Sequence, residues 1–375
     1  ESGLWLRAEW YSKKNELNWR ETVDREVISV RNSVGFCDVS TLGKIDIQGK
    51  DAQEFINKIY CNAFAKLSVG KVRYGLMLRE DGLVMDDGTT ARMSENHFIM
   101  TTTTANADSV YRHLEFCHQC LWPDMEVHLI STTDAWAQIA IAGPNSRKVI
   151  SKIIDPEFDI SNENFPFMAC KEISICGGVI ARLFRISFSG ELAYELSFPT
   201  QYALSFVNYL MEIGKEENII PYGTEALGVM RIEKGHAAGA ELNGTTTALN
   251  LNMGKMVSDN KDSIGSVLSK REGLNQSDDL KLVGIKPINS SDQLISGSHL
   301  FDLSSKVNPQ NDLGYITSSC FSPTLGSYIA LGFLRNGSNR YGEKIRVNNF
   351  LLKKEVLAEV CNPIFVDPNG DKLRE

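Results

Sequence analysis

Apolar residues in the first two thirds of the chain recur with helical spacing in some segments and with strand spacing in others. Four valines between Val23 and Val34 lie at helical spacing, and Gly35 follows as the expected helix C-cap. Ile45 and Ile47 alternate with polar residues, which predicts a strand. Similar patterns predict helices near residues 51–59, 105–120, 202–213 and 224–234, and strands near residues 97–104, 136–142, 183–188 and 194–198.

Segment 74–88 has the pattern of two short apolar strands joined by a tight turn. Asp81 and Gly82 suit a two-residue turn, because both central positions of such a turn need a positive φ. Asp86 and Asp87 follow on the return strand, where neighbouring residues point to opposite faces. A carboxylate in this place either accepts hydrogen bonds from backbone amides or binds a ligand. The pattern leaves both readings of Asp86 open.

The last third of the chain has a different pattern. Residues 258–279 are polar and lack a period, which predicts a linker region around a short helix. From Lys281 onward, apolar strands are separated by turn residues such as Ser322-Pro323. This pattern predicts an all-β domain, either a barrel or a sandwich, after the α and β part.

Length and charge narrow the class of protein. A chain of 375 residues is too long for one ordinary core and indicates two or three domains. Its net charge of -8 argues against nucleic acid as a partner. The sequence has neither a run of about 20 apolar residues nor a signal-peptide pattern, so we expect no membrane association. The first residue is Glu1, which fits a processed product or a piece of a longer polypeptide.

Eight cysteines spread along the chain fit a reducing compartment, and we expect a cytoplasmic protein. Cys117 and Cys120 form the one close pair, with His113 nearby. A structural zinc site would need a second ligand pair, and a redox site would need the pair at a helix N-terminus. We therefore expect ordinary helix-end residues here and no metal site.

Several common catalytic signatures are absent from the sequence. There is no Gly-x-Gly-x-x-Gly after a strand, no phosphate-binding Gly-x-x-x-x-Gly-Lys-Ser/Thr loop and no nucleophile elbow. A substrate or cofactor with reactivity of its own is therefore favoured.

Six motifs in order carry a family resemblance that covers nearly the whole chain. They are Asp38-Val39-Ser40-Thr41-Leu42-Gly43-Lys44-Ile45, Arg73-Tyr74-Gly75-Leu76-Met77-Leu78, Asp86-Asp87, Phe188-Ser189-Gly190-Glu191 with Tyr194-Glu195-Leu196, Arg231-Ile232-Glu233-Lys234-Gly235, and Ser322-Pro323-Thr324-Leu325-Gly326. The set resembles the folate-dependent aminomethyltransferase (glycine-cleavage T-protein) superfamily. The first motif and the tail from Asn362 to Gly370 are similar to the C-terminal half of the sarcosine oxidase α subunit, one branch of that superfamily.

The resemblance implies an α+β, three-domain cloverleaf with folate in its central opening and a C-terminal all-β barrel. The expected domains are residues 1–51 plus 136–257 (a split folate-binding domain), 52–135 (α+β), 258–280 (linker) and 281–375 (barrel). It also implies that Asp86 is the essential acid, that Glu195 holds the pterin ring, and that Tyr74 and Phe188 pack nearby.

The chemistry fits these residue types. A pterin presents an exocyclic amine beside a ring N–H, and a carboxylate such as Glu195 matches that donor pair. An anion at Asp86 would favour a cationic one-carbon unit and accept a proton from the attacking amine. The alternatives are a hydrogen-bonded Asp86, a solvated Glu195 and plain core aromatics at Tyr74 and Phe188. For Glu191 we expect solvation in its turn, and for Arg231 and Glu233 a structural ion pair on one helix, so these three stay outside the predicted site.

One departure bears on the substrate. T-proteins usually carry an Arg-Asp pair where this chain has Leu227 and Gly228, and the sarcosine-oxidase branch lacks that arginine as well. His236 follows Lys234-Gly235, where the iron–sulfur-assembly branch of the superfamily carries a cysteine shortly afterwards. The missing arginine favours the sarcosine-oxidase branch, and the missing cysteine argues against the iron–sulfur-assembly branch. The resemblance as a whole implies tetrahydrofolate as the bound cofactor, with flavin or NAD only on a partner chain or an upstream segment.

Three functions follow as hypotheses. The first is capture of a sarcosine-derived carbon on tetrahydrofolate as 5,10-methylene-tetrahydrofolate, with flavoprotein subunits as partners. The second is a free-standing aminomethyltransferase that acts on aminomethyl-lipoyl protein. The third is a folate-binding regulatory protein without turnover.

Overall fold

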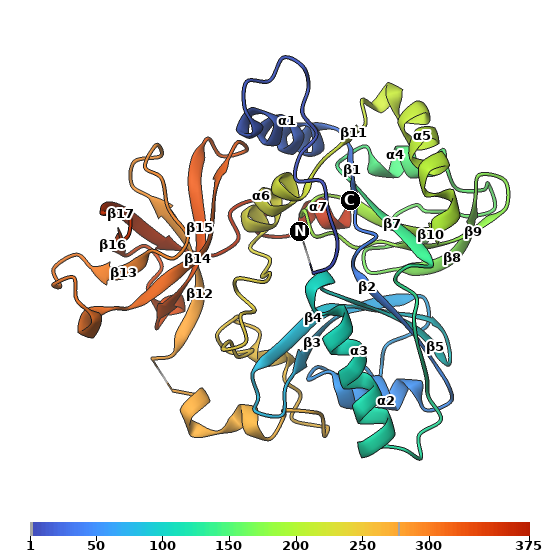
Figure 1. The fold of residues 1–375 in the computed structure, drawn as a ribbon, viewed down its shortest axis with the longest axis horizontal. Helices are drawn as coiled ribbons and strands as arrows, with labels where there is room; N and C mark the ends of the chain where they lie inside the picture. The colour runs from blue at the N-terminus through green and yellow to red at the C-terminus, as the bar shows by residue number, and fades with distance from the viewer. Residues whose placement is uncertain (1–2, 277) are drawn as a thin grey trace.

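The computed structural model describes residues 3–276 and 278–375, which form two open sheets and a closed barrel around a common centre (Figure 1). The first sheet has the order β11-β1-β7-β10-β9-β8, with bounds Ile220–Pro221, Gly35–Asp38, Trp136–Ala142, Ala193–Pro199, Val179–Phe184 and Cys170–Ile175. The second sheet has the order β3-β4-β5-β2-β6, with bounds Lys71–Leu78, Val84–Ser94, His97–Thr102, Gly43–Gln48 and His128–Ser131.

The barrel and the helices complete the architecture. The barrel closes in the order β12-β15-β14-β13-β16-β17, with bounds Leu280–Pro287, Ser327–Arg335, Gly314–Ser322, His299–Asp302, Lys344–Asn349 and Lys354–Cys361. The helices are α1 Trp19–Asn32, α2 Ala52–Ile59, α3 Ala107–Phe116, α4 Ser146–Ser151, α5 Ala203–Ile213, α6 Thr224–Lys234 and α7 Asp371–Arg374. Among the described residues, none of the helices has the length and apolarity that crossing a bilayer requires.

The middle of the first sheet is buried on both faces at β10, which explains the nearly continuous apolar run of that strand. One face packs with α4 and α5 in a core that contains Tyr194 and Leu196. The opposite face packs against α1 and α6, around Val27 and Met230. Because strand neighbours alternate between faces, Glu195 points to the side of α1 and α6.

The second sheet separates two cores. Its outer face carries α2 and α3, with Phe55 and Leu114 fully buried against the strands. Its inner face meets the segment after α6 and the barrel, and we call this meeting place the central junction. Its members from the second sheet, from α6 and the chain that follows, and from the barrel are Leu76, Leu78, Val84, Ile232, Ala237, Ala248, Leu251, Leu282, Ile329, Leu331 and Phe333.

The hairpin of β3 and β4 is confirmed, but the predicted two-residue turn is wrong. Arg79 N donates to Leu83 O at 2.8 Å, and Gly82 N donates to Arg79 O at 3.0 Å. Gly82 has a φ of +85°, whereas Asp81 is not among the residues with positive φ. The connection is therefore a turn followed by one left-handed glycine, the common alternative to a two-residue loop.

The predicted C-cap at Gly35 is also wrong. Helix α1 ends at Asn32 with Ser33 as its C-cap, and Gly35 is the first residue of β1. A Cβ at Gly35 would lie 2.7 Å from Cγ2 of Val30, so a close approach of strand and helix requires glycine here. The polar segment 258–276 holds short 3-10 turns, such as Leu268–Lys270, in place of the expected helix.

Strand β2 belongs to the second sheet, because it pairs with β5 and β6. The sequence assigns residues 1–51 to the first domain, whereas sheet pairing groups β2 with the second. We propose that the second domain begins near Gly43. After the barrel, the chain returns to the first sheet and α6, where α7 lies near the centre (Figure 1).

Candidate functional site

Asp86 lies on the outer face of β4, opposite Met77 of β3, and is 2% exposed. Thr103 donates to it twice, from N to Oδ2 at 3.1 Å and from Oγ1 to Oδ1 at 2.7 Å. Asn106 Nδ2 donates to the same Oδ1 atom at 3.0 Å. Burial raises the pKa of Asp86, and these three donors oppose the rise. The contacts of Asp86 are therefore those of a strand residue that anchors the chain entering α3.

Asp87 lies on the inner face of the same strand. It is paired across the strands with Leu76, a member of the central junction, and Tyr74 shares that face two residues away. Tyr74 donates its hydroxyl hydrogen to Asp87 Oδ2 at 2.8 Å. Burial raises the pKa of Asp87 to about 7, and the negative charge of Asp86 adds to the rise. The Asp87 carboxyl therefore titrates near neutral pH, and it faces the central junction.

Glu195 lies on the face of the first sheet that packs against α1 and α6. Gln138 Nε2 donates to its Oε2 atom, while Ser197 Oγ donates to Gln138 Oε1 at 2.8 Å. These three side chains share one face because Ala140 and Gln138 of β7 are the cross-strand partners of Glu195 and Ser197. The Oε1 atom of Glu195 accepts no hydrogen bond from the described residues, and it is not among the fully enclosed polar atoms.

Electrostatics at Glu195 depend on burial and on one nearby cation. Burial raises the pKa of Glu195 to about 7, and Gln138 and Lys44 act in the opposite direction. Lys44 is 2% exposed and donates to Ser40 O at 2.7 Å and to Leu42 O at 3.0 Å. Burial lowers the pKa of Lys44 to about 8. Glu195 is thus a buried acceptor, and a ligand with two donors would stabilise its charged form.

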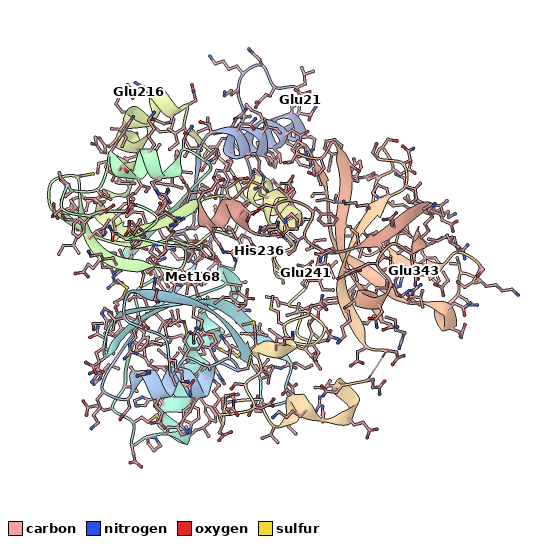
Figure 2. All side chains as sticks on the ribbon, turned by 180° about the vertical axis from the view of Figure 1, so that it is seen from behind. Glu21, Met168, Glu216, His236, Glu241 and Glu343 are labelled. Atoms are coloured by element: carbon pink, nitrogen blue, oxygen red, sulfur yellow. The ribbon has the colours of Figure 1, made fainter. Side chains whose placement is uncertain are left out.

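Phe188 lies in the connection between β9 and β10, and its side chain is 38% exposed. His236 follows α6 and stacks on Phe188, with ring centroids 5.6 Å apart and an angle of 22° between the planes. His236 Nδ1 lies 3.0 Å from Phe188 O. Figure 2 shows His236 in the middle of the molecule, between the two sheets and the barrel. Sequence reasoning did not include His236 in the site.

The expectation that Glu191 is solvated is wrong, because it is 2% exposed. Arg31 Nη1 donates to Glu191 Oε1 at 2.7 Å and to Ser189 O at 2.9 Å. The same guanidinium holds Glu233 through Nε at 3.0 Å. Ser322 of the barrel donates to the other oxygen of Glu233 at 2.5 Å. One cation of α1 therefore joins the Phe188 turn, α6 and the barrel.

The expected ion pair between Arg231 and Glu233 is also wrong. Arg231 Nη1 donates to Glu241 Oε2 at 2.8 Å, and Glu233 pairs with Arg31. Arg31 gave no sequence signal, since a lone helical arginine is usually solvated. The motifs Phe188 to Glu191, Arg231 to Gly235 and Ser322 to Gly326 already named its partners, but only the fold brings these motifs together.

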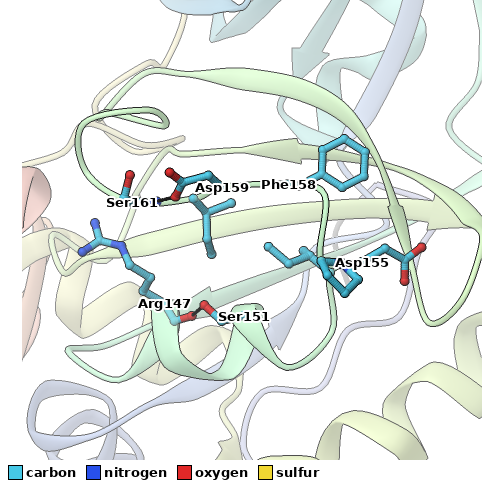
Figure 3. Close-up of a pocket in the computed structure, with 9 residues that line it drawn as sticks. Arg147, Ser151, Asp155, Phe158, Asp159 and Ser161 are labelled. Atoms are coloured by element: carbon cyan, nitrogen blue, oxygen red, sulfur yellow. Dashed lines mark hydrogen bonds between the residues drawn. The ribbon is translucent and has the colours of Figure 1, made fainter.

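Each aromatic residue of the predicted site contacts a residue that the prediction had left out. Tyr74 contacts Asp87, and Phe188 contacts His236. Within residues 3–276 and 278–375, no hydrogen bond joins Glu195 to either aspartate. A surface hollow of about 450 Å³ lies elsewhere, beside α4 (Figure 3). None of the candidate residues lines it; its walls are Arg147, Ser151, Ile154, Asp155, Pro156, Phe158, Asp159, Ile160 and Ser161.

Comparisons with known proteins agree over the whole chain. Residues 1–261 match the family model of the GCVT N-terminal domain, and residues 281–367 match that of the glycine cleavage T-protein C-terminal barrel domain. "Sarcosine oxidase subunit alpha" of Rhizobium meliloti (strain 1021) is 53% identical over 100% of this chain and 38% of that protein. This chain therefore spans about two fifths of the length of that sarcosine oxidase subunit. "Aminomethyltransferase" of Chloroherpeton thalassium is 30% identical over 85% of this chain and 84% of that protein.

A solved structure supports the fold. The glycine cleavage system aminomethyltransferase T from Bartonella henselae superposes with a TM-score of 0.80 at 22% identity, covering 96% of this chain and 95% of that one. The predicted fold with its C-terminal barrel is confirmed. With both family models matched along the chain, this protein belongs to the aminomethyltransferase (glycine cleavage T-protein) family of one-carbon-transferring enzymes.

Proposed function

We propose that this chain binds tetrahydrofolate near the central junction and transfers a one-carbon unit to it, with 5,10-methylene-tetrahydrofolate as product. The observation that carries the proposal is Asp87, a half-buried carboxyl with a pKa of about 7 that faces the junction and has Tyr74 as its hydrogen-bond donor. A carboxyl that titrates near the working pH is suited to accept and return a proton.

Glu195 supports folate as the ligand. A pterin presents an exocyclic amine and an adjacent ring N–H, and a carboxylate can accept from both. Gln138 occupies one oxygen of Glu195, while the other oxygen is free of partners among the described residues. A bound donor pair would therefore add hydrogen bonds to a group that is costly to bury alone. The Phe188 ring, 38% exposed, offers an apolar surface for a planar ring.

We assign the proton transfer to Asp87 rather than to Asp86, the acid that the resemblance implies. Asp86 already accepts three hydrogen bonds from Thr103 and Asn106, so its carboxylate is paired with the segment that leads into α3. Asp87 accepts one side-chain hydrogen bond, from Tyr74, and lies on the inner face of the sheet. Asp86 then acts by positioning β4 and by raising the pKa of its neighbour.

The proposed mechanism uses few protein groups. Tetrahydrofolate would supply the nucleophilic nitrogens that capture the one-carbon unit. Ionised Asp87 stabilises positive charge on the one-carbon donor and accepts the proton that the attacking amine releases. It returns this proton to the donor's amine, which leaves as its bond to the carbon breaks and the second bond to tetrahydrofolate forms. Tyr74 fixes the orientation of the carboxylate, and Glu195 fixes the ring, so that much of the acceleration comes from orientation.

We propose sarcosine as the source of the carbon, oxidised to an imine elsewhere. The support is the 53% identity to a relative named sarcosine oxidase subunit alpha, of which this chain spans 38%. In this proposal the flavin or NAD of the oxidation lies on a partner chain or on another segment. The second candidate, a free-standing aminomethyltransferase on a lipoyl carrier, is supported by the relative of which this chain covers 84%.

A pair of neighbouring variants tests the proposal. Isothermal titration calorimetry under anaerobic conditions measures tetrahydrofolate binding to wild type, Asp86→Asn and Asp87→Asn. Formation of methylene-tetrahydrofolate from glycine and formaldehyde, above the spontaneous rate of the same mixture without protein, measures turnover, and an aminomethylated lipoyl carrier serves as the alternative donor.

We expect Asp87→Asn to bind tetrahydrofolate within about threefold of wild type and to lose at least about a hundredfold in turnover, as for other catalytic acid–base groups. Asp86→Asn should retain more turnover than Asp87→Asn and unfold at a lower temperature, because its donors lose their charged acceptor. Absence of tetrahydrofolate binding to wild type would contradict the function, and the reverse order of the variants would return the role to Asp86.

A further inference from the structure

We propose that His236 is a specificity-determining residue of the same site, whose Nε2 atom accepts a hydrogen bond from the reduced ring of the ligand. The inference rests on the proposed function and adds to it a reason why the site would select tetrahydrofolate over oxidised folate. His236 has no assigned role in the site predicted from the sequence.

The tautomer of His236 follows from its contact with Phe188. Nδ1 lies 3.0 Å from Phe188 O, and a carbonyl oxygen can only accept. Nδ1 therefore carries the hydrogen, and in the neutral ring Nε2 presents a lone pair. Burial lowers the pKa of His236, and the positive charges of Lys234 and Arg231 lower it further, while the Phe188 carbonyl acts in the opposite direction. The ring is therefore a neutral acceptor at neutral pH.

The position of the ring places this acceptor at the centre of the molecule. His236 precedes Ala237, a member of the central junction together with Leu76. Leu76 of β3 is the cross-strand partner of Asp87 on β4, so the His236 segment and the proposed acid border the same junction. Nε2 has no hydrogen-bond partner among the described residues and is not among the enclosed polar atoms. Figure 2 shows His236 between the two sheets and the barrel.

The stacked pair is rigidly supported from behind. Arg31 holds the carbonyl of Ser189, one residue after Phe188, at 2.9 Å. Gly190 has a φ of +82°, and a Cβ there would lie 2.8 Å from the Lys234 side chain. Lys372 of α7 donates to Glu191 at 2.7 Å. The support from three elements fixes the turn, so the Phe188 and His236 rings are oriented before a ligand arrives.

An acceptor at this place distinguishes the two oxidation states of the ligand. Tetrahydrofolate carries N–H groups at N5 and N8 of its reduced ring, whereas in folic acid these nitrogens carry lone pairs. The exocyclic amine and the pyrimidine N–H, which match Glu195, are present in both forms. Glu195 therefore holds either form, while His236 Nε2 pairs with the reduced ring and opposes a lone pair of the oxidised ring.

Competition between the two forms tests the inference. Dissociation constants for tetrahydrofolate and for folic acid are measured by calorimetry for wild type, His236→Phe and His236→Gln. His236→Phe keeps an aromatic ring on Phe188 and removes the acceptor, while His236→Gln restores an acceptor oxygen. His128→Phe is the matched control, because His128 is exposed on β6. Melting temperatures verify that each variant is folded.

We expect wild type and His128→Phe to prefer tetrahydrofolate by at least tenfold. His236→Phe should lose about fivefold to tenfold of that preference through weaker tetrahydrofolate binding, the range for one neutral hydrogen bond. His236→Gln should recover part of it. An unchanged preference in His236→Phe overturns the inference while folate binding stands, and a wild type that binds neither form overturns both. If His236→Phe does not fold, His236→Leu is measured against the same expectation.

Discussion

Arg31 of α1 and Glu233 of α6 lie 202 positions apart and form a buried ion pair, with Arg31 Nε donating to Glu233 Oε2 at 3.0 Å. Their side chains are 4% and 0% exposed. The same guanidinium also binds Glu191 and the carbonyl of Ser189. The pair therefore joins α1, α6 and the turn that carries Phe188, and it connects the scaffold to the proposed folate site.

Replacing Arg31 should destabilise the whole chain. Arg31→Leu leaves Glu233 and Glu191 buried without their cation, and breaking such a pair costs about 3–5 kcal/mol in the free energy of unfolding. Chemical denaturation measures this loss. Arg112→Leu is the control, because Arg112 pairs with Asp108 at the surface with 76% of its side chain exposed, and we expect no measurable change there. Equal effects of the two substitutions would contradict the structural role of Arg31.

Turnover should rise with pH through an apparent pKa near 7. Burial raises the pKa of Asp87 to about 7, and the ionised carboxylate is the form that accepts a proton. Activity is therefore low at pH 5.5 and reaches a plateau above about pH 8. The profile of kcat against pH for wild type measures this limb, and the residual activity of Asp87→Asn should lack it. If kcat of Asp87→Asn still rises with pH near pH 7, a group other than Asp87 causes the rise.

Tyr74→Phe should move that limb to higher pH. The Tyr74 hydroxyl donates to Asp87 and lowers the pKa of the carboxyl below the value that burial alone would set. Without the donor, the apparent pKa of the kcat profile should increase by about one unit, since a hydrogen bond to a charged group contributes roughly 1.5–3 kcal/mol. A profile that does not move, measured on a folded variant, would separate Tyr74 from the proposed acid.

Glu195→Gln should weaken tetrahydrofolate binding by roughly tenfold to a hundredfold, because two hydrogen bonds to a charged acceptor are lost. Wild-type binding should also weaken as the pH falls below about 7, where Glu195 becomes protonated, and this pH dependence should be absent in Glu195→Gln. Calorimetry between pH 6 and 8 measures both effects. Ser197→Ala, which removes only the donor to Gln138, should change binding much less.

The protonation of Glu195 should also make folding stability depend on pH. Stability should decrease as the pH rises, whereas tetrahydrofolate binding should strengthen. The pKa of Glu195 rises from 4.5 to about 7 on folding, so between these values the folded state holds a proton that the unfolded state has lost. The stability from this proton is fully present below about pH 4.5 and is lost as the pH rises to about 7, on the order of 3 kcal/mol. Glu195→Gln should remove this part of the slope in urea denaturation measured from pH 4.5 to 7.5. An unchanged slope would show that Glu195 is not buried as described.

Much of the local structure followed from patterns within short segments. Strand β7 and helix α6 have the predicted bounds, because their apolar spacing is regular and long enough to distinguish the two periods. Gly35 and the Asp81-Gly82 turn were mispredicted because their conformations depend on neighbours outside the segment. A Cβ at Gly35 would lie 2.8 Å from the Tyr222 ring, and a Cβ at Gly82 would lie 2.5 Å from the backbone of Ser269, so residues far along the chain constrain both glycines.

The sequence by itself determined the family, the α and β part, the barrel and the alternation that sends Asp86 and Asp87 to opposite faces, since each depends on neighbours along the chain. Only the tertiary structure decided which aspartate faces the central junction. It also decided that Glu191 is buried beside Arg31 and that His236 stacks on Phe188. The reason is physical: burial, pKa and hydrogen-bond partners are set by groups that lie far apart along the chain and meet only when the sheets and barrel pack together.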